Sequence, residues 1–212
     1  MSETNLLHNN PLERLRRGLD VAVPAIVLRA RPFRDSDLMA HLLTPTMGKI
    51  SAIGRHARGS RKRFPSSLDL FDRGTARLTR EKNGALTIKE FSPSHSLAKL
   101  RYDLDKLTLA SLLCEAFDLV LQENTGEDSS EIFEILDLSL NAIDEAIELK
   151  TSLRATLVGI VSLAKKEGII DLSTSAPGSR TLSIALESIE RFCERKLLTK
   201  SSVEPIVKRL SA

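Results

Sequence analysis

The sequence predicts an α+β protein, in which a small five-stranded β-barrel is followed by an all-α helical domain. Short apolar runs separated by Gly, Pro, Asn and Asp fill the region from residue 23 to residue 93, a pattern typical of strands joined by hairpins. From residue 94 the apolar positions recur every three or four residues, which indicates amphipathic helices. We therefore expect a barrel domain over 23–93, a helical domain over 94–212 and an N-terminal extension over 1–22.

Five strands account for the first domain. Their predicted ranges are 25–30, 38–44, 50–54, 68–78 and 85–91, and residues 31–37 are turn-like. Pro45-Thr-Met-Gly48 has the composition of a tight turn, and Asn83-Gly84 is a strong two-residue hairpin signal. Five short strands with hairpins and one longer loop fit a small closed barrel such as an OB-fold.

Five helices account for the second domain. We expect them over about 97–120, 132–143, 153–164 and 182–197, with a short last one that begins near Ser202 as its cap. Asn124-Thr-Gly126 should end the first helix, Asp128 and Glu131 have the spacing of a capping box, and 171–180 should form a loop. In the extension, Leu12, Leu15 and Leu19 fit one side of a short helix, while a flexible, disordered segment is an equal alternative.

The charges are distributed unevenly along the chain. Residues 1–80 hold 15 of the 31 Lys and Arg residues but only 7 of the 28 Asp and Glu residues, so this half has a net charge of +8. The remainder of the chain has a net charge of −5. We expect the basic half, and not the acidic half, to face a polyanion.

The most basic segment is the stretch Lys49–Phe64, which contains no carboxylate. Gly54, Gly59 and Ser60 interrupt it, so it is predicted to be a flexible loop rather than a basic helix. Such a loop projecting from a sheet is suited to binding phosphates, although a merely solvated loop is the alternative. Its candidate DNA-binding cations are Lys49, Arg55, Arg58, Arg61, Lys62 and Arg63.

Stacking on bases would add to phosphate binding, because proteins that bind single strands commonly use aromatic rings for this purpose. The chain has only seven Phe, one Tyr and no Trp. Phe33 and Phe64 lie beside basic residues and are the candidates, while packing in the barrel core is the alternative for each. Arg guanidinium planes can stack in their place. Arg34, beside Phe33, is a further candidate DNA-binding cation.

No pattern in the sequence indicates catalysis or a metal. The four histidines form no ligand pair, and Cys114 and Cys193 are expected to be reduced, packed thiols. Gly48-Lys49 resembles the end of a P-loop, but Ile50 stands where Ser or Thr must meet magnesium. Asp35 and Asp37 are carboxylates of a turn, and a local cap or ion pair explains them better than a metal site. We therefore expect no enzyme activity and no cofactor.

Several of these motifs, in this order and spacing, resemble the RecO family of bacterial recombination and DNA-repair proteins. The resemblance is strong over about a quarter of the chain. It rests on Ala25-Ile-Val-Leu28, Arg34-Asp-Ser-Asp37, Leu43-Thr-Pro-Thr-Met-Gly-Lys49, Gly54-Arg-His-Ala-Arg-Gly-Ser60 and Leu70-Phe71. A weaker likeness continues through Glu115 and Ile132-Phe133. The four-cysteine zinc module of some relatives is absent from this sequence, the C-terminal region is short, and residues 1–22 look like an extension.

The resemblance implies an N-terminal OB-fold and a helical domain, with the basic stretch on the DNA-binding face. It implies binding of single- and double-stranded DNA, annealing of complementary strands, and loading of RecA at gaps coated by the single-stranded-DNA-binding protein SSB. The implied partners are RecR and the C-terminal tail of SSB, for which Arg154, Lys165 and Lys166 are candidate contacts. Because the sequence has neither a membrane-length apolar run nor a signal-peptide core, we expect a cytoplasmic, nucleoid-associated protein that does not contact membranes.

Two other functions fit the same residues. An OB-fold accessory protein that binds RNA would need the same cations, because only contacts to the 2′-hydroxyl tell RNA from DNA. A non-enzymatic scaffold would use the basic stretch to meet an acidic protein partner. A nuclease is the least implausible enzyme, and strand cleavage with magnesium or manganese would reveal it.

Overall fold

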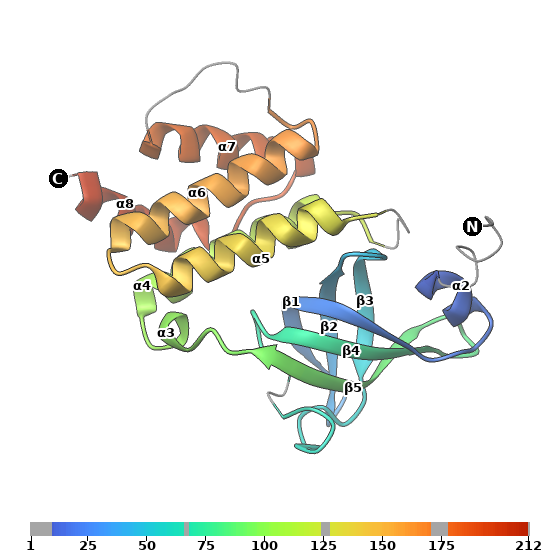
Figure 1. Ribbon diagram of the computed structural model, residues 1–212. Coiled ribbons are helices and arrows are strands. Elements are labelled where there is room, and N and C mark those ends of the chain that lie inside the picture. Colours follow the sequence, from blue (N-terminus) through green and yellow to red (C-terminus); the bar gives the residue numbers. More distant parts are fainter. Residues whose placement is uncertain (1–9, 66–67, 124–127, 171–177, 212) are drawn as a thin grey trace, which may run out of the picture. The chain divides into compact units, whose positions relative to one another are not determined.

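A β-barrel forms the N-terminal part of the chain because five segments alternate between apolar residues that point inward and smaller or polar residues that point outward. The computed structural model describes residues 10–65, 68–123, 128–170 and 178–211. The strands pair in the order β1–β2–β3–β5–β4 and close on β1 (Figure 1). Among the five strands of the described residues, β3 and β5 form the one parallel pair. This topology confirms the predicted α+β fold class with an OB-fold barrel. The strands are β1 (Val21–Phe33), β2 (Asp37–Thr44), β3 (Gly48–Gly54), β4 (Arg73–Arg80) and β5 (Leu86–His95).

The long first strand closes the barrel because it pairs with two neighbours. Residues 21–26 of β1 pair with β4, and residues 26–33 pair with β2. An irregularity between Val27 and Arg29 separates the two stretches, and a bulge of this kind bends a strand and increases its twist. The interior is filled by apolar residues of all five strands, including Val23, Leu42 and Phe91, which are almost fully buried.

Three predicted strand ranges were wrong at their ends: β5 continues to His95, and β1 begins at Val21, within the predicted extension. β1 continues to Phe33, so the turn comprises only residues 34–36. β4 begins at Arg73, because residues 68–72 form a turn that is hydrogen-bonded to the bent part of β1. Phe71 N donates to Val27 O at 3.1 Å, and Val27 N donates to Asp72 O at 2.9 Å.

A short helix, α2 (Pro11–Arg16), precedes the barrel and is fixed to it. The Asn10 side chain accepts a hydrogen bond from Leu12 N at 2.9 Å. Pro11 occupies the first turn, where a backbone N–H would have no partner within the helix, so the N–H that proline lacks is not needed. Leu15 is 1% exposed and belongs to the barrel core. The helical alternative for the extension is therefore the one observed for residues 11–16, while residues 1–9 lie outside the described residues.

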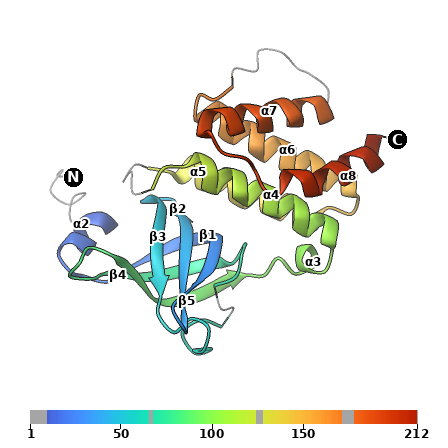
Figure 2. The ribbon, with the colours of Figure 1, turned by 180° about the vertical axis from the view of Figure 1, so that it is seen from behind.

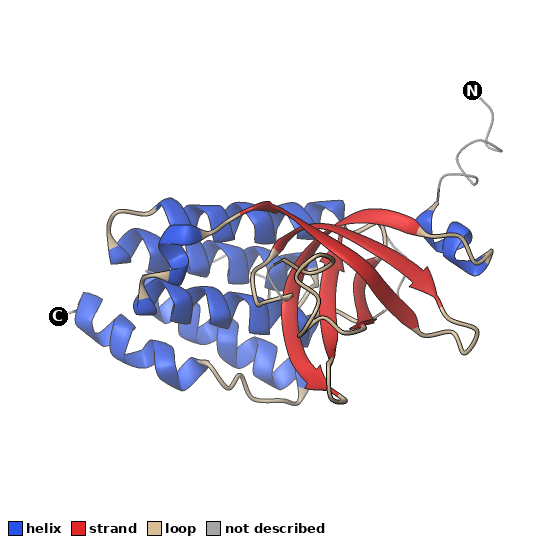
Figure 3. Cartoon of the chain, turned by 90° about the horizontal axis from the view of Figure 1, so that it is seen from below, coloured by secondary structure: helices blue, strands red, loops and turns tan. Residues whose placement is uncertain are grey.

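The remaining helices are those expected, with shifted ends. The long helix predicted over 97–120 is divided, because the Asp103 carboxylate caps a new helix by accepting from Asp105 N at 3.0 Å and Lys106 N at 3.1 Å. Helix α4 contacts α6, α7 and α8, and α6 contacts α7, so that these helices run side by side (Figures 2 and 3). The helices are α3 (Ala98–Arg101), α4 (Leu104–Val120), α5 (Ser130–Glu145), α6 (Leu149–Lys166), α7 (Gly178–Cys193) and α8 (Lys200–Ser211).

The chain divides into two compact units, of which the first is Met1–Ser96 with Gln122–Phe133 and the second is Leu97–Leu121 with Glu134–Ala212. The segment after α4 belongs to the first unit because the backbone of Glu123 forms an isolated parallel β-bridge with Lys49 of β3. In the same segment, Ser129 N donates to Pro45 O at 2.8 Å. The Asp128 carboxylate accepts from Ser130 N at 2.9 Å at the start of α5. The predicted helix end at 124–126 and most of the predicted loop at 171–180 lie outside the described residues.

None of the described helices combines the length and the apolar character that a membrane span requires.

Candidate nucleic-acid interface

The basic loop, defined here as residues 55–65, follows β3 and has a hydrogen-bonded shape where the sequence predicted a flexible one. Gly59 N and Ser60 N both donate to His56 O, at 3.1 and 3.0 Å, and Phe64 N donates to Ser60 O at 2.9 Å. On the far side of the loop, Phe91 N of β5 donates to Arg63 O at 2.9 Å. The cations of the loop are thus carried by a backbone that is already ordered.

The β1–β2 turn at residues 34–36 holds this loop from one side. Asp37 Oδ1 accepts a hydrogen bond from His56 N at 2.9 Å, and Ser36 Oγ lies 2.9 Å from His56 Nδ1. Arg58 donates through its backbone N to Ser36 O at 3.2 Å and through Nη1 to Asp35 O at 3.1 Å. Asp37 therefore caps the loop locally, as expected. No group of three or more His, Cys, Asp or Glu among the described residues could hold a metal ion.

Two apolar side chains anchor the loop in the barrel. Ala57 is 1% exposed and Phe64 is fully buried, and both belong to the barrel core. The close packing at the start of the loop requires Gly54, since a Cβ there would lie 2.7 Å from Leu68 Cδ1. Burial removes Phe64 from the predicted stacking surface. Because Phe64 directly follows three basic residues, the sequence did not distinguish a buried anchor from an exposed ring.

The predicted cations differ in how much of each is available to a ligand. Arg34, Arg58, Arg61 and Lys62 are exposed. Arg61 and Lys62 have no ion-pair or hydrogen-bond partner for their side chains within the described ranges. Lys49 is buried in β3, so it is removed from the exposed part of the predicted surface.

The two half-buried arginines of the loop, Arg55 and Arg63, contribute to its positive charge and also make contacts that stabilise its structure. Arg55 Nη2 lies 3.4 Å from Glu81 Oε1 in the β4–β5 turn. Arg63 Nε donates to Ser60 Oγ at 3.2 Å, and the Arg63 guanidinium lies 5.7 Å from the centre of the Phe64 ring. A similar cation–π contact at 5.2 Å joins Arg34 to Phe33. Phe33 is half-buried and lies outside the barrel core cluster, so part of its surface stays available.

An outward-facing row on β1, β2 and β3 was missed by the sequence reasoning. Arg31 pairs with Met39, and Met39 pairs with Ile53, so their side chains share the outer face of three adjacent strands. Arg31 is exposed and the two apolar residues are half-buried. Leu38, Ala40 and Leu42, which alternate with Met39 along β2, belong to the barrel core instead. The signal was available, since oligonucleotides commonly bind the strand 2–3 face of an OB-fold.

The thiols of the chain do not belong to this interface. Cys114 is fully buried in α4, and burial raises the pKa of its thiol, which makes it inert as a nucleophile. Cys193 is half-buried, and both cysteines are free thiols.

Comparison with known proteins agrees with this architecture. Residues 19–97 match the family model described as "Recombination protein O N terminal". The chain belongs to the RecO family. It is 33% identical over 146 residues to the "DNA repair protein RecO" of Anaeromyxobacter sp. (strain K), an alignment that covers 68% of this chain and 56% of that RecO protein.

Other RecO proteins match over similar lengths. The "DNA repair protein RecO" of Clostridium kluyveri is 32% identical over 131 residues, with 61% of this chain and 50% of the relative covered. That of Symbiobacterium thermophilum is 32% identical over 118 residues, with 56% and 46% covered. The chain spans about half the length of the curated RecO proteins it matches.

Proposed function

We propose that this chain is a DNA-binding recombination mediator of DNA repair, and that its barrel, predicted over 23–93, holds DNA by the phosphate backbone. The observation that carries this proposal is the ordered basic loop. Its exposed cations are Arg58, Arg61 and Lys62, and hydrogen bonds from Arg58 to Asp35 O and Ser36 O hold the loop against the turn that contains Arg34. Cations that are already ordered lose little conformational entropy when phosphates bind.

The activity that follows is annealing of complementary single strands, with single- and double-stranded DNA as ligands. Neutralising two phosphate backbones lowers their mutual repulsion, while contacts restricted to phosphates leave the base edges free to pair. No bond is made or broken in this step, so we propose a mediator rather than an enzyme. A protein that works on chromosomal DNA would act at the nucleoid.

In this proposal the helical domain, predicted over 94–212, recruits other repair proteins. We assign to the chain the partners RecR and the C-terminal tail of SSB, and through them the loading of RecA at gaps. An acidic, apolar tail needs a cation beside an apolar surface. On α6, exposed Arg154 lies one turn from Val158, whose exposed fraction is 55%, and Lys165 is exposed farther along the same helix.

Annealing of two complementary oligonucleotides, in about 50 and about 200 mM salt, tests the DNA proposal. The test variant is Arg58→Ala/Arg61→Ala/Lys62→Ala. The matched control, Arg180→Ala/Arg191→Ala/Lys208→Ala, removes three exposed cations of α7 and α8. The loop variant should anneal poorly, and the salt dependence of its single-strand binding should fall by about 0.7 for each phosphate that it no longer neutralises. The control should behave as wild type.

Each other outcome has a distinct meaning. Absence of DNA binding by the wild type would refute the proposal. The non-enzymatic scaffold that binds an acidic protein would then be the remaining function. Preference for RNA in competition with DNA of the same sequence would favour the RNA-binding accessory protein. Equal losses in the loop variant and the control would show that only total charge matters.

A further inference from the structure

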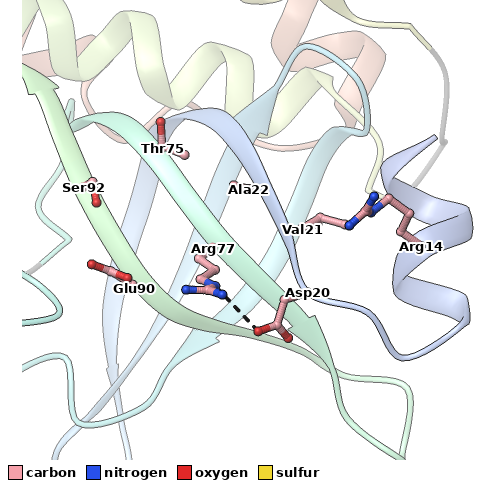
Figure 4. Close-up of a pocket in the computed structure, with 8 residues that line it drawn as sticks. All are labelled: Arg14, Asp20, Val21, Ala22, Thr75, Arg77, Glu90 and Ser92. Carbon is pink, nitrogen blue, oxygen red and sulfur yellow. Dashed lines mark ion pairs between the residues drawn. The ribbon is translucent and has the colours of Figure 1, made fainter. Parts of the chain in front are cut away.

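A groove of about 390 Å³ lies on the outer face of the barrel, beside α2 and away from the basic loop in sequence. Three of the strand residues that line it have small side chains: Ala22 of β1, which lies opposite Arg77, and Thr75 of β4, which lies opposite Ser92 of β5. Arg14 of α2 also lines the groove (Figure 4). The small side chains leave room for an extended chain to lie along the strands beside Arg77 and Glu90.

Two arginines line this groove, and one of them is unpaired. The side chain of Arg14 is exposed and has no hydrogen-bond or ion-pair partner in the part of the chain that the structure describes. Arg77 Nε lies 3.6 Å from Asp20 Oδ2, and 57% of the Arg77 side chain is exposed. Helix α2 fixes the position of Arg14, because the adjacent Leu15 is buried in the barrel core.

A third cation lies beside the groove because of an irregularity in β5. Arg77 pairs with Glu90 while the next residue, Leu78, pairs with Ile88, so Lys89 is the extra residue between them. Bulges re-aim side chains in this way. Lys89 Nζ lies 3.3 Å from Asp20 Oδ1. A hydrogen bond from Thr79, followed in importance by the contact with Lys89, lowers the pKa of Asp20, so this carboxylate remains charged and holds both cations.

We propose that this groove is a second phosphate-binding site, which holds a nucleic-acid strand other than the one on the basic loop. The inference rests on the proposed function, because annealing requires two strands at once. The groove offers two guanidinium groups and the hydroxyl groups of Thr75 and Ser92, which suit a sugar–phosphate backbone better than the apolar side chains of a peptide. Glu90 is the acidic residue that lies directly opposite Arg77, and it opposes phosphate binding.

The test uses two variants whose effects should have opposite signs. Arg14→Gln/Arg77→Gln should bind a single strand of about ten nucleotides within twofold of wild type, because the basic loop is intact and one such strand fills one site. Its annealing rate at low salt should fall by at least about tenfold. Glu90→Gln removes a repulsive charge without removing a cation, so it should anneal about two- to fivefold faster than wild type.

The outcomes separate this inference from the proposed function. If the wild type binds and anneals DNA through the basic loop, but the double Gln variant anneals at the wild-type rate, the second site is wrong and the mediator stands. If Glu90→Gln anneals no faster, the groove carries no strand. If wild-type protein fails to bind DNA at all, both proposals fall. Arg14 and Arg77 are exposed and Glu90 is half-buried, and thermal unfolding of each variant checks that the barrel is intact.

Discussion

The order of the basic loop, and not only its charge, should determine how tightly DNA binds, and Asp37 distinguishes the two contributions. Its carboxylate accepts the hydrogen bond from His56 N at 2.9 Å. The Asp37→Ala variant removes both the negative charge and the acceptor. The Asp37→Asn variant removes the charge but keeps an oxygen that can accept from His56 N. If charge alone mattered, both substitutions would strengthen phosphate binding, because both remove an anion near the cations.

The two effects can be compared in magnitude. A hydrogen bond to a charged group contributes about 1.5–3 kcal/mol, so this is the upper limit of what the loop loses in Asp37→Ala. If binding must restore the order of the loop, the same free energy is subtracted from the affinity, which amounts to about a tenfold to hundredfold weaker Kd. The gain from removing one partly screened charge is smaller, about 1 kcal/mol or less. Order should therefore outweigh charge.

Fluorescence anisotropy with a labelled single strand measures both variants. Asp37→Asn should bind as tightly as wild type or tighter, and Asp37→Ala should bind more weakly. Urea unfolding of the same samples reports whether the barrel remains intact, because Asp37 is buried at the start of β2. Tighter DNA binding by both variants would refute the reasoning, because the loop would then act only through its net charge and not through its order.

Two further predictions concern the helical domain. A Cβ at Gly159 would lie 2.6 Å from Ser139 Oγ and 2.8 Å from Leu113 Cδ1, so overpacking of about 1–3 kcal/mol should outweigh the roughly 1 kcal/mol that Ala gains in a helix. Gly159→Ala should thus unfold at lower urea, and Ser139→Ala should partly restore it; a stabilised Gly159→Ala would contradict this packing. Burial alone would raise the pKa of Glu190, but Lys200 Nζ, 2.7 Å away, lowers it overall. This contribution to stability is present above the ordinary carboxyl pKa and is lost as the pH falls through the lower folded-state value. Glu190→Gln should therefore lose less stability on acidification in urea unfolding, and an equal loss would exclude the pair as the cause.

The strand pattern predicted the barrel because its inner face follows the simple rule of alternation. The turns Pro45–Gly48 and Asn83-Gly84 also lie where their composition placed them, between β2 and β3 and between β4 and β5. The end of β1 was missed because Arg31 and Pro32 look like turn residues. In the structure both residues are exposed, and they lie on a bent strand whose register with β2 continues to Phe33. Local composition does not report a bend that exists only because one strand pairs with two neighbours.

The candidate surface was predictable in its charge but not in its geometry. Spacing placed Arg58, Arg61 and Lys62 in one loop, which the structure bears out. Three-dimensional folding was needed to show that Phe64 points into the core and that the loop is hydrogen-bonded to the β1–β2 turn. The hydrogen bonds with that turn join residues about twenty positions apart in sequence, and no local pattern encodes such a pairing.

The scarcity of aromatic residues on this surface limits how the protein can hold a strand. Met39 and Ile53 can exclude water from a base, but an aliphatic side chain lacks the flat π-face that makes stacking worth about 1–3 kcal/mol per base. Phe33 is the half-buried exception, and the Arg34 guanidinium already lies over its ring. In the proposed function, most of the affinity for DNA therefore comes from contacts between cations and phosphates, which are indifferent to sequence and sensitive to salt. We propose that such a surface binds a strand tightly at low salt and releases it once pairing with a complement brings in a second backbone.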